Sequence, residues 1–261
     1  MRPLRIGVVD YVNSRPLARG LEKERASGRF ELRYLSPARI ADQLAAGELD
    51  VGLLPSIELA RIAGLAVVPG IAIAATHEVR SVLLVSQVPI AEIRRLAVDE
   101  NSRTSAALVR ILLEERYGLR PATVPAAPRL AEMLAGADAA LLIGDPALRV
   151  DRERYVVLDL AGEWLELTGL PFVFAVWAVR EERASLELDQ LFARSLATGM
   201  AELESIVAET AVETGLPAAV LRDYYRRNLR FEMGSAEQRG LAEFLSRAER
   251  AGLVGAPLPA R

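Results

Sequence analysis

Short apolar runs that alternate with amphipathic helical stretches constrain the fold of this 261-residue chain more than any other feature. In the first half, strand-like runs occupy residues 4–9, 30–36 and 50–55, and helical spacing occupies residues from about 16, 38–49 and 56–64. A β-α-β-α order predicts a parallel sheet with helices on its faces. The run RSVLLVS at 80–86 then predicts one further long strand.

The pattern restarts after Ser86. Further strands are predicted at 94–100, 121–126 and 155–160, a strand followed by a turn is predicted within 137–148, and helices are predicted at 102–118 and 130–137. The continuous apolar run LPFVFAVWAVR at 170–180 is typical of a buried strand. From about Ser185 onward the spacing predicts only helices, at 188–211, 218–229 and 235–252.

This restart favours a two-lobed α/β protein with a ligand cleft between the lobes. Residues 1–86 and 175–261 would form a discontinuous lobe I, and residues 87–174 an inserted lobe II, joined by two crossing strands. A single doubly wound domain remains the alternative, because periodicity does not count sheets.

Composition excludes several classes of function. The chain has 32 basic and 35 acidic residues mixed along its length, a balance that argues against nucleic-acid binding. Without cysteine, disulfides are excluded. With one histidine, a metal site would have to be almost all carboxylate, which suits magnesium or calcium better than zinc, and the sequence shows no clustered carboxylates of that kind. No apolar run approaches the roughly 18 residues of a membrane span. The first residues lack a signal-peptide pattern, so a cytoplasmic location is expected.

Four polar turns follow predicted strands at the points where helices begin. They are Asn13-Ser14-Arg15-Pro16, Pro55-Ser56-Ile57-Glu58, Asn101-Ser102-Arg103-Thr104-Ser105 and Gly144-Asp145-Pro146. In open parallel sheets the ligand binds at the carboxyl ends of the strands, so all four turns should face one cleft.

The residues of these turns favour an anionic ligand. Helix N-termini present unpaired N–H groups and a partial positive charge, and hydroxyl or amide side chains add neutral donors. Residues 102–105 are the best candidate, although ordinary helix capping by Ser or Asn is the simpler explanation of such turns. Asp145 is most simply a helix cap, unless it accepts a hydrogen bond from a ligand hydroxyl.

Other polar and aromatic residues carry weaker signals. Ser81 and Ser86 are five positions apart on one predicted strand, so their side chains point to opposite faces and only one can reach the cleft. His77 is a possible base, but a lone loop histidine is usually only solvated. Glu58 is most simply a first-turn charge. Four aromatic residues favour the core over ligand stacking: Trp164, Phe172, Phe174 and Trp177. No GxSxG or Gly-rich phosphate motif is present.

Six motifs together resemble a known family. They are DYVNSRPL after the first strand, GELDVGLLPSIE, RSVLLVSQVPI, SRTS at a helix start, LIGDPAL and TGLPFVFAVWA. In order and spacing they are similar to the chorismate dehydratases of the futalosine route to menaquinone. The likeness extends from about Ile6 to Arg180 and covers little of the helical C-terminal third.

The resemblance implies a periplasmic-binding-protein-like fold of type II, and a lyase that converts chorismate to 3-[(1-carboxyvinyl)oxy]benzoate and water without a cofactor. It implies that Asn13 and Ser81 are the catalytic residues. The substrate-binding residues it implies, together with those of the polar turns, are Ser14, Ser56, Ser102, Arg103, Thr104, Ser105, Gly144 and Asp145. The expected partner is a small dicarboxylate, with no nucleic acid and no membrane span.

The chemistry suits a site with few acids and bases, because dehydration turns the diene ring of chorismate aromatic. Asn13 and Ser81 would orient the ring and stabilise developing charge. The base would be the side-chain carboxylate of the substrate or a protein group. Two alternatives remain: the 1,4-dihydroxy-6-naphthoate synthase of the same route, whose N-terminal motif differs from DYVNSRPL, and a non-catalytic carboxylate-binding protein. The oligomeric state and any ligand contact of Arg15 are not predicted.

Overall fold

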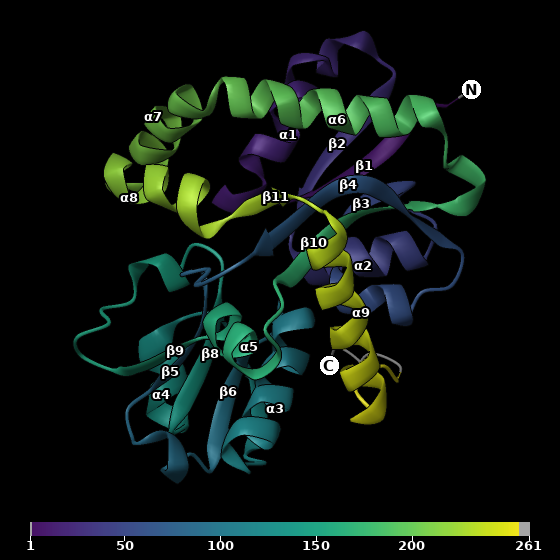
Figure 1. Cartoon of the computed structure of the whole chain (residues 1–261). Coiled ribbons are helices and arrows are strands. Elements are labelled where there is room, and N and C mark those ends of the chain that lie inside the picture. Colours follow the sequence, from purple (N-terminus) through teal and green to yellow (C-terminus); the bar gives the residue numbers. More distant parts are fainter. Residues whose placement is uncertain (1, 256–261) are drawn as a thin grey trace. The chain divides into compact units, whose positions relative to one another are not determined.

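A computed structural model describes residues 2–255 and divides the chain into two compact units, each with its own sheet (Figure 1). The first unit contains the described residues up to Pro55, Gly64–Ala75 and Val173–Gly234. The second unit contains Ser56–Ala63, Thr76–Phe172 and the described residues from Ser235 onward. The chain therefore passes between the units several times.

The first unit is built on a six-stranded sheet with the order β11-β4-β10-β3-β1-β2. Its strands are β1 (Leu4–Val9), β2 (Phe30–Leu35), β3 (Val51–Pro55), β4 (Leu65–Ala75), β10 (Phe172–Arg180) and β11 (Arg230–Glu232). Its helices are α1 (Arg15–Lys23), α2 (Pro37–Ala45), α6 (Leu186–Ala201), α7 (Leu203–Thr214) and α8 (Ala218–Asp223), followed by the π-helix η7 (Tyr224–Asn228). Short 3-10 turns are η1 (Val12–Ser14), η2 (Arg25–Ser27) and η6 (Glu181–Arg183).

The pairing of this sheet confirms the parallel arrangement predicted for the first three strands. Strand β1 pairs in parallel with β2 and with β3. Strand β10, the long apolar run, instead pairs antiparallel with β3, and β11 pairs antiparallel with β4. The sheet is therefore mixed, and β1 has a parallel neighbour on each side.

The second unit is built on a five-stranded sheet with the order β7-β6-β8-β5-β9. Its strands are β5 (Val82–Ser86), β6 (Arg95–Asp99), β7 (Ala122–Ala126), β8 (Ala139–Ile143) and β9 (Val156–Asp159). Its helices are α3 (Thr104–Tyr117), α4 (Leu130–Gly136), α5 (Leu160–Thr168) and α9 (Ser235–Arg250), with 3-10 turns η3 (Ser56–Ala60), η4 (Ile90–Glu92) and η5 (Ala147–Arg149). Strand β6 is parallel to β7 and β8, whereas β5 is antiparallel to β8 and β9.

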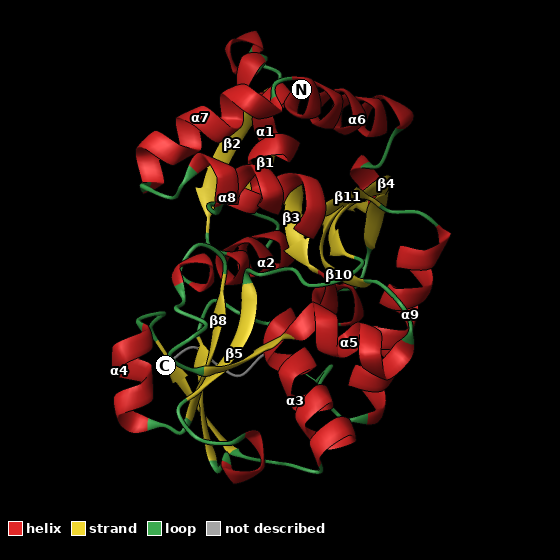
Figure 2. Cartoon of the chain, turned by 60° about the vertical axis from the view of Figure 1, so that its left-hand side comes forward, coloured by secondary structure: helices red, strands yellow, loops and turns green. Residues whose placement is uncertain are grey.

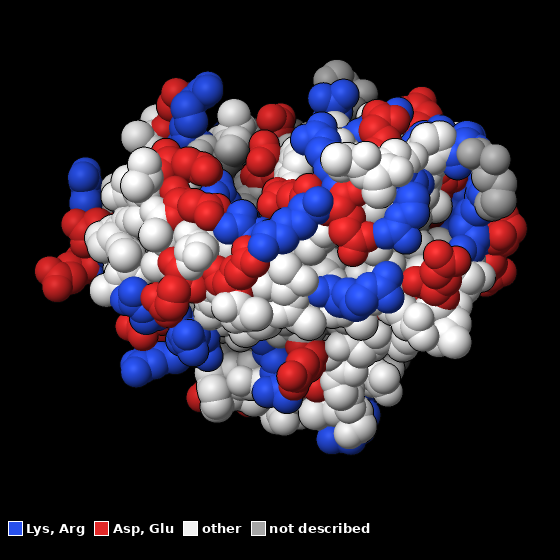
Figure 3. All heavy atoms as spheres, turned by 90° about the horizontal axis from the view of Figure 1, so that it is seen from above, with Lys and Arg blue, Asp and Glu red and all other residues white. Residues whose placement is uncertain are grey.

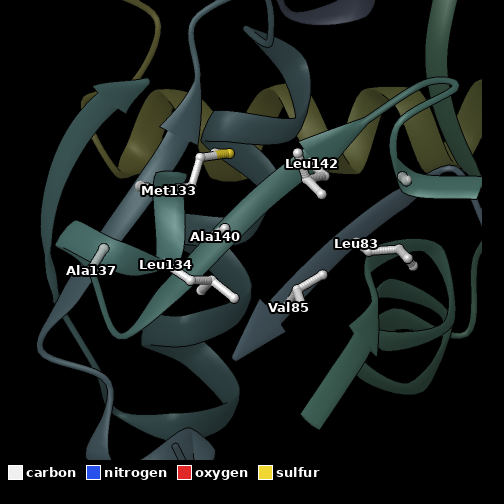
Figure 4. Close-up of a cluster of buried hydrophobic side chains, with 9 residues drawn as sticks. Leu83, Val85, Met133, Leu134, Ala137, Ala140 and Leu142 are labelled. Carbon is white, nitrogen blue, oxygen red and sulfur yellow. The ribbon is translucent and has the colours of Figure 1, made fainter. Parts of the chain in front are cut away.

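Alternating side chains bury both faces of this second sheet. Helix α4 covers one face, and α3 and α5 lie on the other (Figure 2). Leu83 and Val85 of β5, Ala140 and Leu142 of β8 and Met133 of α4 belong to one cluster of buried hydrophobic side chains (Figure 4). Because successive strand residues point to opposite faces, the intervening residues of β5 and β8 pack toward the other helices. Fully buried strands of this kind read as continuous apolar runs in the sequence.

The C-terminal helix α9 belongs to the second unit through an aromatic cluster. Phe244 of α9 lies 4.9 Å from the ring of Phe172 and 6.2 Å from that of Trp164, both edge to face. A Cβ atom on Gly240 would lie 2.0 Å from the carbonyl oxygen of Pro171, so the helix approaches this backbone closely. The internal contacts thus group α9 with residues 76–172, whereas the sequence pattern predicts it in lobe I.

Three elements differ from those predicted. Residues 56–64 do not form a regular helix, because only the short 3-10 turn η3 is present. The 11-residue strand β4 was not predicted, since Pro69 and Gly70 interrupt its apolar run; Gly70 has a positive φ of 76°, which suits glycine. The run at 80–86, predicted to be a crossing strand, supplies β5 within the second sheet instead.

The buried carboxylate of Asp50, paired with two arginines, fixes the start of β3 to the start of β1. The carboxylate of Asp50 is 2% exposed and accepts hydrogen bonds from the Arg2 guanidinium at 2.7 Å and from the Arg5 backbone N–H at 2.9 Å. Burial alone raises the pKa of Asp50, but the hydrogen bonds from Arg2 and Arg5 outweigh it and hold that pKa below its ordinary value.

This pKa shift predicts a pH-dependent contribution to stability. A carboxyl whose pKa is lower in the folded than in the unfolded state stabilises folding above about pH 4, and the contribution is lost as the pH falls further. We expect Asp50→Asn to lower the free energy of unfolding at neutral pH. The difference from wild type should shrink between about pH 4 and pH 2, as measured by urea unfolding. A constant difference over this range would contradict the assignment.

Acidic and basic side chains are interleaved on the face seen from above in Figure 3. The first unit contains surface ion pairs such as Arg19–Glu202 and Arg19–Glu209. Exposed pairs of this kind contribute little to stability. Among residues 2–255, no helix is long and apolar enough to span a membrane, and no group of three or more potential metal-binding side chains is present.

Candidate functional site

The first polar turn leaves β1 through η1 and enters α1. Its Ser14 hydroxyl lies 2.5 Å from the Val9 carbonyl oxygen and 2.9 Å from that of Tyr11, so it donates back to the strand end. Ser14 occupies the N-cap position of α1, but its side chain makes no capping hydrogen bond. The simple explanation that Ser14 caps this helix is therefore wrong.

Asn13, the second residue of this turn, carries an unsatisfied buried acceptor. Its Oδ1 atom is buried and has no hydrogen-bond partner among the described residues. The preceding carbonyl of Val12 accepts a 2.8 Å hydrogen bond from the hydroxyl of Tyr225, a fully buried residue of the π-helix η7. A buried amide oxygen without a partner is costly, which marks Asn13 as a candidate ligand contact.

The N-terminus of α3 forms the corresponding turn of the second unit. Ser102, Thr104 and Ser105 are all buried there. Arg103 occupies the N-cap position, and its side chain makes no capping hydrogen bond. The Ser102 hydroxyl is buried without a partner among residues 2–255. This hydroxyl and the N–H groups of the first helical turn, which have no partner within the helix, form the kind of donor set that binds a carboxylate.

Asp99, at the end of β6, lies immediately before this turn and was not among the predicted site residues. Its Oδ1 accepts the backbone N–H of Asn101 at 2.9 Å, while its buried Oδ2 has no partner within the described part of the chain. Burial raises the pKa of Asp99 against the opposing hydrogen bonds from Asn101. A carboxyl shifted toward its neutral form repels an anionic ligand less.

Hydroxyl groups connect η3 to the start of α3 within the second unit. The Ser56 and Thr104 hydroxyl oxygens lie 3.4 Å apart, and both residues are buried. The Thr104 hydroxyl also accepts the Ile57 backbone N–H at 3.2 Å. The structure therefore brings together two turns whose bonded residues, Ile57 and Thr104, are 47 positions apart and which follow strands of different sheets, β3 and β6.

Glu58 has a larger structural role than the sequence indicates. It is 1% exposed and forms ion pairs with Arg61 at 2.7 Å and with Arg103 at 3.5 Å. Because α-helix is absent here, Glu58 does not complement a helix dipole. It fixes the guanidinium group of Arg103 beside the start of α3. No local sequence signal could have indicated this contact, since the two residues are far apart in the chain.

Ser81 and Gly144 meet at the same edge of the second sheet. Strand β5 begins where the antiparallel β8 ends, and the Gly144 N–H donates to the Ser81 carbonyl oxygen at 2.8 Å. Ser81 is 1% exposed, and Gly144 has a positive φ of 66°. Asp145 is half-buried, but Pro146 rather than Asp145 occupies the N-cap position of η5.

The remaining candidates are placed as follows. His77 is exposed, and Arg15 forms an ion pair with Glu213 at 2.5 Å. The four aromatic residues are buried as predicted: Trp164, Phe172, Phe174 and Trp177.

The predicted site residues are divided between the two units. Asn13 and Ser14 belong to the first unit. The second unit contains the other predicted site residues: Ser56, Ser81, Ser102, Arg103, Thr104, Ser105, Gly144 and Asp145. A shared cleft for the two sets stays a prediction.

Solved structures with the same architecture define the class of the fold. A protein from Archaeoglobus fulgidus matches with a TM-score of 0.76 and 16% identity, covering 97% of this chain and 98% of its own. The alkanesulfonate-binding protein SsuA from Xanthomonas axonopodis pv. citri matches with a TM-score of 0.70 and 20% identity, covering 98% and 95%. Two mixed sheets with their helices, together with these neighbours, define a two-lobed periplasmic-binding-protein fold.

The family is more specific than the fold. Residues 4–250 match the family described as menaquinone biosynthesis, and the chain belongs to this family. A chorismate dehydratase from Thermus thermophilus is 29% identical over 99% of this chain and 98% of its own length. A chorismate dehydratase from Campylobacter jejuni is 29% identical over 68% of each chain. These relatives agree with the resemblance noted in the sequence.

Proposed function

We propose that the protein is a chorismate dehydratase, a hydro-lyase that converts chorismate to 3-[(1-carboxyvinyl)oxy]benzoate and water. We place this reaction in the cytoplasm, on the futalosine route to menaquinone. Membership of the menaquinone biosynthesis family and the names of the two relatives support this proposal. The polar turns of the chain support it independently.

One observation carries the proposal furthest. Three buried side-chain oxygens without a partner among residues 2–255 lie in or beside the polar turns: Asn13 Oδ1, Asp99 Oδ2 and Ser102 Oγ. Native proteins seldom leave buried polar atoms unpaired, and functional sites are a common reason for exceptions. A ligand with hydroxyl and carboxylate groups would satisfy such atoms. Chorismate carries two carboxylates and one ring hydroxyl.

The reaction needs few ionisable groups. The C–H bond at the ether-bearing ring carbon breaks, the neighbouring C–O bond breaks, and a further ring double bond forms as one water leaves. The ring becomes aromatic, so much of the driving force lies in the substrate. The base would be the side-chain carboxylate of the substrate or a protein group, and donors that stabilise the developing charge would supply the rest.

We assign the roles as follows. The Ser102 hydroxyl and the backbone N–H groups at the start of α3 would bind a substrate carboxylate, with Thr104 and Ser56 supporting the turn. Asn13 and Ser81 would orient the ring and stabilise the departing hydroxyl. The ion pair with Glu58 holds Arg103 near the turn.

Incubation of the purified protein with chorismate tests the function. We expect a new aromatic ultraviolet absorption and a product whose mass is that of chorismate less one water. Unchanged chorismate with binding detected by calorimetry would instead support a non-catalytic binding protein. Unchanged chorismate without binding would reject chorismate as the ligand.

A further inference from the structure

The backbone just before Ser81 adopts a conformation that side chains disfavour. Arg80 has a φ of 64° and is the one non-glycine residue with a positive φ among residues 2–255. In this left-handed region the Cβ atom crowds the backbone, so glycine, asparagine and aspartate predominate there. Interactions with neighbouring residues must therefore hold Arg80 in this conformation. Backbone strain of this kind is frequent at functional sites.

The carboxylate of Asp159 holds this segment directly. Its Oδ2 atom accepts the Arg80 backbone N–H at 2.6 Å, and its Oδ1 atom accepts that of Val79 at 3.0 Å. Asp159 is 6% exposed and ends β9, which pairs with β5. A buried carboxylate that accepts two successive N–H groups fixes the orientation of the two peptide groups that lead into the Cα atom of Arg80.

Asp159 also caps α5, and its two carboxylate oxygens accept different hydrogen bonds. The Oδ1 atom accepts the N–H groups of Ala161 and Gly162, at 3.1 and 3.3 Å, in addition to that of Val79. The Oδ2 atom accepts the Arg80 backbone N–H and lies 3.6 Å from the guanidinium of Arg152. Helix capping alone does not require the second oxygen, because asparagine caps helices as well as aspartate does.

The dihedral angles of Arg80 decide where the Ser81 side chain points. Ser81 follows Arg80 directly, and its carbonyl oxygen accepts the Gly144 N–H at 2.8 Å. The backbone around Ser81 is therefore held before it by Asp159 and after it by Gly144. A change of the Arg80 conformation would turn the Ser81 hydroxyl away from its present direction.

We propose that Asp159 is a positioning residue for Ser81: through its Oδ2 atom it holds Arg80 in the left-handed conformation and so orients the Ser81 hydroxyl for catalysis. The inference rests on the proposed function, in which Ser81 acts on the substrate. Asp159 itself contacts the backbone, so its effect on catalysis passes through the geometry of residues 79–81.

The experiment combines substitutions at the two positions. Asp159→Asn keeps one acceptor oxygen for capping and places an amide group where Arg80 needs an acceptor. Arg80→Gly removes the Cβ atom, so the left-handed conformation no longer needs support. Arg80→Ala is the matched control, because it also removes the guanidinium but keeps the Cβ atom. Chorismate turnover is measured for each single variant and for both double variants.

We expect Asp159→Asn to lower kcat by about tenfold with KM changed less than about twofold, since small misplacements of catalytic groups act mainly on kcat. Arg80→Gly alone should remain close to wild type. Asp159→Asn with Arg80→Gly should recover most of the lost kcat, and Asp159→Asn with Arg80→Ala should not. Equal kcat values for the two double variants, or an unchanged kcat in Asp159→Asn, would overturn the inference.

A failure of the proposed function can be told apart from a failure of the inference about Asp159, because in the first case the wild-type protein would not convert chorismate. In that case the melting temperatures of the same proteins test the backbone part of the inference. Arg80→Gly should restore part of the stability lost in Asp159→Asn, and Arg80→Ala should not. Equal melting temperatures for the two double variants would overturn it.

Discussion

Replacing Asn13 or Ser81 by alanine is expected to lower kcat/KM for chorismate by about a hundredfold each, the usual effect of removing one group that stabilises developing charge. Asn13 carries a buried amide oxygen without a partner among the described residues, and Ser81 is buried at the sheet edge beside Gly144. Steady-state kinetics with chorismate measure the effect. Values within twofold of wild type for both variants would remove these residues from the proposed mechanism.

Two matched controls separate catalysis from folding. Ser86, at the other end of β5, is equally buried, but its hydroxyl donates to the Val88 carbonyl oxygen at 2.7 Å. Gln43 of α2 has a buried Oε1 atom that, like the Oδ1 atom of Asn13, has no partner among residues 2–255, but Gln43 lies outside the polar turns. Ser86→Ala and Gln43→Ala should leave kcat/KM near wild type, although Ser86→Ala should cost about 1 kcal/mol of stability.

The largest effect on stability is expected for Gly199→Ala. Helices α1 and α6 lie side by side in the first unit (Figure 1). A Cβ atom on Gly199 would lie 1.9 Å from the Pro16 carbonyl oxygen and 2.6 Å from its carbonyl carbon. Backbone atoms cannot turn aside as a flexible side chain can, so α6 would have to move away from α1. We expect a loss of about 3 kcal/mol, at the upper end of the usual cost of overpacking.

Thermal and urea unfolding measure this loss, which corresponds to a fall in melting temperature of about 6–12 °C for a chain of this size. Gly136→Ala is the control, because a Cβ atom there would meet no other atom within 4 Å. An added methyl group in a helix normally stabilises by about 0.5–1 kcal/mol. Similar effects of the two substitutions would show that the contact between α1 and α6 adapts easily.

Much of the fold follows from local sequence patterns. The apolar runs that became β1, β2, β3, β8 and β10 were predictable because buried strands need continuous or alternating apolar side chains. Strand β4 was missed because Pro69 and Gly70 normally indicate a turn, and the local pattern does not show that neighbouring strands tolerate them. The position of α9 depends on Phe244 and Gly240, whose partners come from distant segments.

Some residues of the candidate site were likewise visible in the local sequence, whereas others depend on tertiary contacts. The polar turns at residues 13–14 and 102–105 were visible as hydroxyl and amide residues at strand ends, and the structure leaves Asn13 and Ser102 with unsatisfied buried atoms. Glu58 and Asp159 were not predicted as part of the site. Both act through long-range contacts with distant residues, Arg103 and Arg80 respectively.

Residue order alone thus establishes the alternation of strands and helices, the family and the polar turns, because periodicity and short motifs are local properties. The tertiary structure determines the features that depend on contacts between residues distant in sequence. It decides which strands are neighbours, which helix joins which unit, and which carboxylate holds Arg80 in its left-handed conformation. These outcomes depend on packing and hydrogen bonding between segments, and their free energies arise only when the whole chain is assembled.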